Sequence, residues 1–205
     1  MLVTEPMECG RLLGIVSEAV GGGVGLVQLR DRGLQPDELA ETALAVKAAV
    51  GDALLLVNGD TRGATLCGAD GVHLPEAGPA PAAIRGAAGR EILVGRSVHS
   101  VKAALLAAAE GVDYIVAGTI FASASHPDRA GTGIGFLREV CGAVTVPVLA
   151  IGGITPEHVA ECIEAGAAGV AVISGILHAP DPREAAARYR AELAKAAREY
   201  DGTGS

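Results

Sequence analysis

The sequence contains eight short apolar runs that alternate with stretches of amphipathic character. The runs are residues 2–4, 25–30, 53–58, 71–74, 92–97, 114–121, 146–152 and 169–174. The stretches between them include 36–50, 100–111 and 155–166, where apolar residues recur every three or four positions, as on one face of a helix. Strands that are apolar throughout suggest a parallel sheet that helices cover on both faces. The pattern therefore predicts an α/β fold.

Eight strand–helix units in about 200 residues fit a compact (β/α)8 TIM barrel. We predict one barrel domain over residues 1–200 and a disordered tail over 201–205. A doubly wound open sheet is the alternative, but the first run is not followed by the GxGxxG loop that binds a dinucleotide in such folds. The barrel predicts an active site at the carboxyl ends of the strands.

Composition limits the classes of partner. The formal net charge is −8 and no run of Lys and Arg concentrates positive charge, which argues against nucleic-acid binding. No apolar run approaches the length of a membrane span, so we expect a soluble cytoplasmic protein. Cys9, Cys67, Cys141 and Cys162 are far apart and form no ligand motif, so we expect buried thiols and neither zinc nor disulfides. The sequence does not determine the oligomeric state, and a homodimer is one of the options that it leaves open.

The ends of the predicted strands carry polar residues and glycine turns. Gly152 and Gly153 follow the seventh run, and Thr155 and Pro156 are typical of a helix start. Backbone N–H groups in such a turn favour an anion, most often a phosphate. The residues expected on one rim are Gln28, Arg30, Asn58, Ser97, Thr119, Gly152, Gly153, Ser174 and Gly175. We therefore predict a phosphorylated small-molecule substrate.

Seven segments, in order, resemble the thiamine phosphate synthase superfamily over nearly the whole chain. They are QLRDR, LLLVNG, GADGVHLPE, VGRSVHS, DYIVAGTIF, VPVLAIGGITPEH and AGAAGVAVISGI. The resemblance implies the same (β/α)8 barrel. The superfamily contains the synthase, which joins a hydroxymethylpyrimidine diphosphate to a thiazole phosphate, and thiazole tautomerases, which aromatise a carboxythiazole phosphate.

The resemblance to the synthase weakens at the positions that handle diphosphate. The family's two lysine positions hold Arg32 and His126, and its metal-binding aspartates fall on Gly59 and Gly78. Asp60 and Glu76 lie close by in sequence as substitutes. Diphosphate departure normally needs Mg²⁺ on carboxylates. We therefore expect no metal and no cofactor, with Mg²⁺ required only if the synthase alternative holds.

The half of the site that holds the thiazole phosphate matches better. Ser123 and Ser125 stand where the family has two threonines, and Gly153 with the Ile173–Ser174 turn supplies N–H groups. The segments around Asn58 and Ser97 also resemble the tautomerase branch. We therefore predict a thiazole tautomerase, with a divergent synthase and a non-catalytic thiazole-phosphate sensor as alternatives.

Proton transfer needs an acid and a base rather than a metal. A known tautomerase has a histidine where this chain has Thr119, so His126, on the same loop, is the candidate replacement. Arg30 is the candidate for holding a substrate carboxylate, and Thr119 and Gln28 complete the set of catalytic candidates. His73 is interpreted as a hydrogen-bonded core residue, and His99 as a capping residue.

Overall fold

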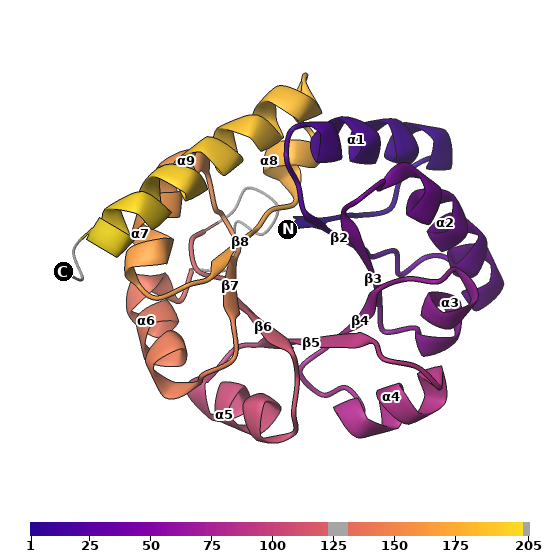
Figure 1. Cartoon of the computed structure of the whole chain (residues 1–205), viewed down its shortest axis with the longest axis horizontal. Helices are drawn as coiled ribbons and strands as arrows, with labels where there is room; N and C mark the ends of the chain where they lie inside the picture. The colour runs from indigo at the N-terminus through magenta and orange to yellow at the C-terminus, as the bar shows by residue number, and fades with distance from the viewer. Residues whose placement is uncertain (123–130, 203–205) are drawn as a thin grey trace.

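The computed structural model describes residues 1–122 and 131–202, and Figure 1 views it down the barrel. Eight parallel strands form one sheet in the order β1 to β8. A bridge between Leu2 and Val172 joins the first strand to the last, and the Val3 N–H donates to the Val172 carbonyl at 2.9 Å. The predicted (β/α)8 barrel is confirmed, and the open-sheet alternative is wrong because the two edge strands pair.

The strands are short and alternate with helices, with two helical segments together after each of the last two strands. The strands are β1 Leu2–Val3, β2 Leu26–Leu29, β3 Leu54–Asn58, β4 Gly71–Leu74, β5 Leu93–Val98, β6 Tyr114–Gly118, β7 Val148–Ile151 and β8 Gly169–Ala171. The helices are α1 Cys9–Gly21, α2 Pro36–Ala49, α3 Thr61–Leu66, α4 Pro81–Ala88, α5 Val101–Ala109, α6 Gly133–Ala143, the 3₁₀ turn η1 Pro156–His158, α7 Val159–Glu164, α8 Ser174–Leu177 and α9 Pro182–Gly202.

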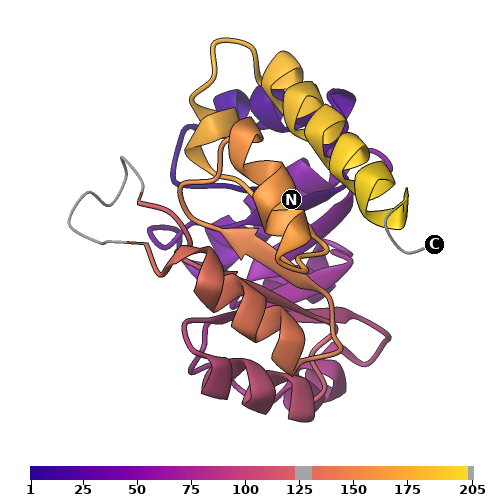
Figure 2. The same cartoon turned by 90° about the vertical axis from the view of Figure 1, so that its left-hand side faces the viewer.

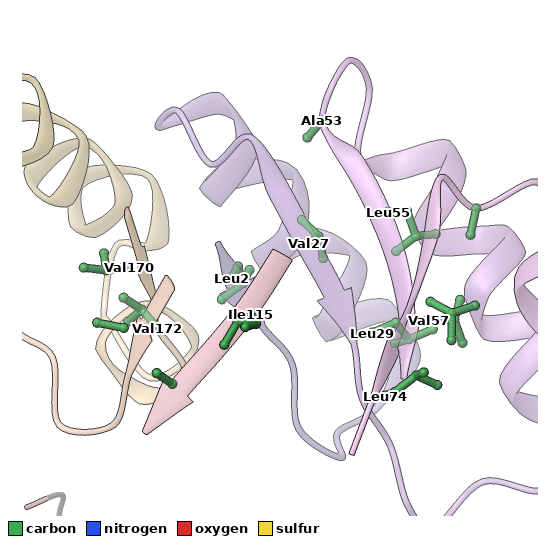
Figure 3. Close-up of a cluster of buried hydrophobic side chains, with 14 of the residues drawn as sticks. Leu2, Val27, Leu29, Ala53, Leu55, Val57, Leu74, Ile115, Val170 and Val172 are labelled. Atoms are coloured by element: carbon green, nitrogen blue, oxygen red, sulfur yellow. The ribbon is translucent and has the colours of Figure 1, made fainter. Parts of the chain in front are cut away.

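The core has two parts because successive strand side chains point to opposite faces. The larger part lies between the sheet and the helices and includes Leu2, Val27, Leu55 and Ile115 (Figure 3). The smaller part fills the barrel interior with Val3, Leu56, Tyr114, Val116 and Ala171. The helices form an outer ring in which α9 packs between α7 and α1 (Figures 1 and 2). The interior therefore holds few apolar residues and leaves room for polar ones.

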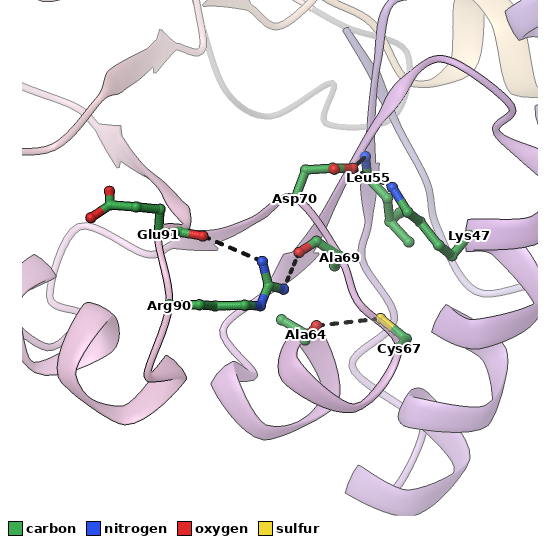
Figure 4. Close-up of polar contacts among 8 residues, drawn as sticks. All are labelled: Lys47, Leu55, Ala64, Cys67, Ala69, Asp70, Arg90 and Glu91. Carbon is green, nitrogen blue, oxygen red and sulfur yellow. Dashed lines mark hydrogen bonds and ion pairs between the residues drawn. The ribbon is translucent and has the colours of Figure 1, made fainter.

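Aspartates at two strand starts form a repeated contact. Asp70 precedes β4, and its carboxylate accepts from the Leu55 N–H at 2.7 Å and from Lys47 Nζ at 2.6 Å (Figure 4). Asp113 precedes β6 and accepts likewise from the Val94 N–H at 2.6 Å and from Arg85 at 2.7 Å. Each carboxylate thus satisfies a backbone donor of the preceding strand, before the following strand begins to pair.

Several boundaries differ from those expected. The sixth run was expected to reach residue 121, but β6 ends at Gly118, although the Ile120 and Phe121 N–H groups still donate to carbonyls beside β7. The tail was expected from residue 201, but α9 continues to Gly202. All four cysteines are free; Cys67 and Cys162 are buried as expected, Cys141 is partly buried, and Cys9 is exposed because it begins α1 at the surface. Within the described residues, no helix is long and apolar enough to cross a membrane.

Candidate active site at the carboxyl ends of the strands

A cavity of about 700 Å³ opens where the strands end. Ten of the residues expected to form the site line it: Gln28, Arg30, Asn58, Ser97, Thr119, Gly152, Gly153, Ile173, Ser174 and Gly175. Ser123, Ser125 and His126 lie outside the described residues. The rim expected from the sequence is therefore one continuous surface, while the chemical roles of its residues stay predictions.

The double-glycine turn has positive φ angles at both positions, 100° at Gly152 and 62° at Gly153. A Cβ on Gly153 would lie 2.4 Å from the Ala122 carbonyl oxygen, and one on Gly152 would lie 2.4 Å from Thr119 Cγ2. The space where these Cβ atoms would stand is taken by the segment after β6, so the glycines let two neighbouring strand ends pack together.

His158 and Tyr189 hold this turn, and the sequence analysis gave neither a role. The His158 ring stacks on Phe121 with centroids 4.0 Å apart, and its Nδ1 lies 3.1 Å from the Gly153 carbonyl oxygen. The Tyr189 hydroxyl donates to the Ile154 carbonyl at 2.9 Å. A Cβ on Gly175 would lie 2.4 Å from that same hydroxyl, so Tyr189 also contacts the turn after β8. No local sequence signal marks these contacts, because the partners come from separate elements.

The inner wall of the cavity is a series of hydrogen-bonded polar side chains. Gln28 Nε2 donates to Asn58 Oδ1 at 2.9 Å. His73 is buried and contacts Ser97 Oγ at 2.8 Å through Nε2 and the Tyr114 hydroxyl at 2.9 Å through Nδ1. Burial lowers the pKa of His73 to about 4, so the ring is neutral at physiological pH. The interpretation of His73 as a hydrogen-bonded core residue agrees with these contacts, and the residue also faces the cavity.

Charged residues gather at the mouth of the cavity. Arg30 is partly buried, and its backbone N–H donates to Thr4 Oγ1 at 2.9 Å. Burial lowers the pKa of Arg30, and no carboxylate of residues 1–122 or 131–199 lies within 4 Å of its guanidinium. Arg32 lines the same mouth. This side of the cavity therefore favours an anionic group.

Of the residues that the structure describes, two carboxylates also line the cavity, and each contacts a histidine. Glu76 accepts from the His99 backbone N–H at 2.6 Å and contacts His99 Nδ1 at 2.9 Å. Glu5 contacts His178 Nε2 at 2.5 Å. The sequence analysis named neither Glu5 nor His178 as a site residue. His99 was interpreted as a capping residue, and its backbone contact with Glu76 joins the loops after β4 and β5.

The fit of a magnesium ion depends on the carboxylates of the cavity wall. Gly59 and Gly78 supply none, and the described part of the chain has no group of three or more His, Cys, Asp or Glu suited to a metal. The Oδ2 atom of Asp60 is buried and has no hydrogen-bond partner in the described part of the chain, but Asp60 is not part of the cavity wall. Glu76 is part of that wall. Since Mg²⁺ is often held by one or two carboxylates together with substrate phosphates, Glu76 suits an ion that arrives with a diphosphate.

A closed parallel barrel with a polar cavity at the carboxyl ends of its strands is the architecture of a TIM-barrel enzyme. The family model described as thiamine monophosphate synthase matches residues 1–176, and the chain belongs to this family. The resemblance noted from the sequence is thereby confirmed.

Individual relatives extend over most of the chain. It is 40% identical over 185 residues to the thiamine-phosphate synthase of Methanoregula boonei, covering 89% of this chain and 86% of the relative. It is 39% identical over 201 residues to the putative thiamine-phosphate synthase of Geobacter sulfurreducens, covering 94% and 92%. Among solved structures, the thiamine phosphate pyrophosphorylase of Pyrococcus furiosus superposes with a TM-score of 0.85 at 29% identity, covering 95% of each chain.

The names of these relatives bear on the predicted activity. The two sequence relatives are named as synthases and the solved structure as a pyrophosphorylase, so these names give the predicted tautomerase no support, and those of the sequence relatives favour the synthase alternative. A 3-hexulose-6-phosphate synthase superposes with a TM-score of 0.72 at 19% identity, covering 94% of this chain and all of the other, and this likeness concerns the fold alone.

Proposed function

We propose that the protein is a thiamine phosphate synthase, a transferase that joins a hydroxymethylpyrimidine diphosphate to a thiazole phosphate and releases diphosphate. The observation that carries the proposal is the identity of about two residues in five, over nine-tenths of the chain, with relatives named for this activity. A transferase with two phosphorylated substrates needs two places for anions. Arg30 and Arg32 would form one and the glycine turns the other, and both line the cavity.

The two proposed anion-binding regions differ in chemistry. At the turns after β7 and β8, backbone N–H groups near Gly153 and Ser174 would hold the thiazole phosphate. Across the cavity, Arg30 and Arg32 would hold the diphosphate, because a guanidinium fork matches phosphate oxygens. The pyrimidine ring would then lie between them, against the Gln28–Asn58 pair and Ser97.

The bonds that form and break in this reaction determine which roles the cavity residues must fill. The thiazole nitrogen forms a bond to the pyrimidine methylene carbon while the carbon–oxygen bond to diphosphate breaks. Negative charge grows on the departing diphosphate, so fixed positive charge at Arg30 and Arg32 lowers the barrier. When bound, Mg²⁺ would add further neutralisation, held by Glu76 and phosphate oxygens. The cavity wall would align the two rings for the displacement.

The test is an assay of thiamine phosphate and diphosphate formation from the two substrates, with and without Mg²⁺. Activity that depends on Mg²⁺ is expected. Arg32→Ala should raise the KM for the pyrimidine diphosphate by about 10-fold, the loss of one charge-assisted contact. Arg138→Ala is the matched control, because Arg138 is exposed on α6 and away from the cavity. Absence of product under all conditions would overturn the proposal.

A tautomerase is the second candidate, because Gly59 and Gly78 remove both carboxylates that the synthase resemblance assigns to the metal. Such an enzyme would aromatise the carboxythiazole phosphate, with Arg30 on the carboxylate and His126 as acid or base. The tautomerase would be favoured by a turnover rate that a chelator leaves unchanged and that falls about 10²-fold in His126→Asn. Full activity in that variant would remove His126 from the mechanism.

A further inference from the structure

Three side chains form one continuous hydrogen-bonded chain through the barrel interior. Tyr114 begins β6 and lies deep in the barrel, His73 lies on β4, and Ser97 on β5 reaches the cavity. The links are 2.9 Å from the Tyr114 hydroxyl to Nδ1 and 2.8 Å from Nε2 to Ser97 Oγ. Gly95 makes room for the tyrosine, since a Cβ there would lie 1.9 Å from the Tyr114 Cζ.

The direction of hydrogen donation along this chain follows from Tyr114. Among the residues that the structure describes, His73 Nδ1 is the one group bonded to its hydroxyl. If the hydroxyl only accepted, its own proton would be buried without an acceptor, which costs about 1–3 kcal/mol. The hydroxyl therefore donates to Nδ1. A neutral imidazole carries one proton, so that proton lies on Nε2 and is donated to Ser97 Oγ.

The consequence appears at the cavity end. Ser97 Oγ already accepts from His73, and its own hydroxyl proton has no acceptor among residues 1–122 and 131–199. We propose that Tyr114 and His73 are positioning residues that fix Ser97 as a hydrogen-bond donor to an acceptor atom of the bound substrate. If the proposed function holds, that acceptor is a ring nitrogen of the pyrimidine substrate, and a ligand that presents an N–H group at this place is rejected.

The same arrangement assigns His73 a role other than proton transfer. Its Nδ1 lone pair is occupied by the tyrosine and its Nε2 already carries a proton, so the ring has no free site for a substrate proton. Burial lowers the pKa of His73 and raises that of Tyr114, so both groups keep these protonation states at neutral pH. His73 acts through Ser97 rather than on the reacting atoms.

The direct test is nitrogen NMR of the histidine rings in the protein without ligand, with the His73 signals assigned by their loss in His73→Gln. The Nε2–H tautomer is expected, with Nδ1 as acceptor, unchanged between about pH 6 and 8. Tyr114→Phe should shift the Nδ1 signal. Tyr189→Phe, the matched control, removes another buried tyrosine hydroxyl that bonds elsewhere and should leave it in place. An Nδ1–H tautomer, or a mixture of the two, would overturn the proposal.

A binding experiment tests whether Ser97 donates a hydrogen bond to the substrate. Glutamine keeps an N–H donor at the reach of Nε2, whereas asparagine is too short to meet Ser97. Affinity for hydroxymethylpyrimidine diphosphate, measured by calorimetry, should fall less than about 3-fold in His73→Gln and about 10-fold in His73→Asn, near one hydrogen bond. Equal losses would contradict the donor role. If the wild-type protein binds no pyrimidine diphosphate, the proposed function fails, while the tautomer still decides the hydrogen-bond direction.

Discussion

Gly153 combines two demands that only glycine meets. Its φ of 62° lies in the left-handed region, and its α-carbon faces the carbonyl oxygens of Phe121 and Ala122. Gly89, at the end of α4, has a φ of 63° but nothing within 4 Å of the place where a Cβ would stand. The two residues therefore share the backbone requirement and differ in packing.

Gly153→Ala and Gly89→Ala separate the two demands. Gly89→Ala should cost about 1 kcal/mol of unfolding free energy through left-handed strain alone. Gly153→Ala should cost about 2–4 kcal/mol, because the Cβ also pushes the segment after β6 away from the turn. Urea unfolding measures both, and calorimetry with thiazole phosphate should show weaker binding only in Gly153→Ala. Similar losses in the two variants would refute the packing argument.

The position of the glycine turn was predictable from local chemistry, and its packing was not. Two glycines before Thr155 and Pro156 mark a strand-to-helix turn from local residues. The contact between His158 and Phe121, and the chain from Tyr114 to Ser97, depend on strand register between distant parts of the sequence. His73 was interpreted correctly as a bonded core residue, but its partners could not be named.

At the scale of elements, Asp70 and Asp113 each supply a carboxylate just before a strand, and the start of β8 lacks one. The Asp70 N–H donates to the Leu55 carbonyl, the Asp113 N–H to that of Val94, and the Ala168 N–H to that of Val148. Ala168 thus occupies the equivalent place before β8 without a carboxylate. It is exposed, and it lines a shallow groove together with Arg190, which would resemble the Lys47 and Arg85 partners.

Ala168→Asp should therefore stabilise the barrel. The new carboxylate would accept from the Val148 N–H and face Arg190, adding about 1 kcal/mol and raising Tm by about 2–4 °C. Ala168→Asn is the control, because it offers an acceptor without the charge and should give a smaller gain. Scanning calorimetry measures the three proteins. A lower Tm in Ala168→Asp would mean that the three strand starts are not equivalent.

The strands and helices could be predicted from the sequence because each strand-forming run is apolar along its length and bounded by turns. The end of β6 was misjudged because Thr119, Ile120 and Phe121 continue the apolar pattern after regular pairing stops at Gly118. The Ile120 N–H still donates to the Ile151 carbonyl at the end of β7, and the Phe121 N–H to that of Gly152. Composition alone therefore does not separate strand from strand-like loop.

For the whole molecule, the buried His73 couples barrel stability to pH. Its pKa is about 4 in the folded protein against 6.5 unfolded, because burial disfavours the charged ring. The unfolded chain therefore binds the proton first as pH falls. The stability contributed by the neutral ring is fully present above about pH 6.5, and it is lost progressively as pH falls toward 4.

A difference of about 2.5 pKa units corresponds to about 3 kcal/mol, at roughly 1.4 kcal/mol per unit. Urea unfolding between pH 7 and 4 should show a decline of this order in the wild-type protein beyond that of His73→Gln, which has no titrating ring. Parallel pH profiles for the two proteins would show that His73 does not titrate on unfolding.

The closed barrel itself was predictable, since eight apolar strands covered by helices leave few other architectures. The way it closes was not predictable, because β1 has only two residues and its pairing with Val172 gives no local signal. The family was identifiable from ordered motifs. The activity was not: the tautomerase predicted from the sequence found no support among the relatives, and the role expected of His126 stays a prediction because it lies outside the described residues.

The space that Gly95 leaves for the Tyr114 ring links two positions on neighbouring strands by volume. A protein of this family could gain a side chain at position 95 only if the residue at 114 became smaller, and that change would also remove the phenol from His73. Residues at positions 95 and 114 should therefore change together among relatives. Where they do, the direction of the hydrogen bond at Ser97 should change as well. In relatives, a glycine at position 95 would then indicate that the serine equivalent to Ser97 still donates a hydrogen bond into the cavity.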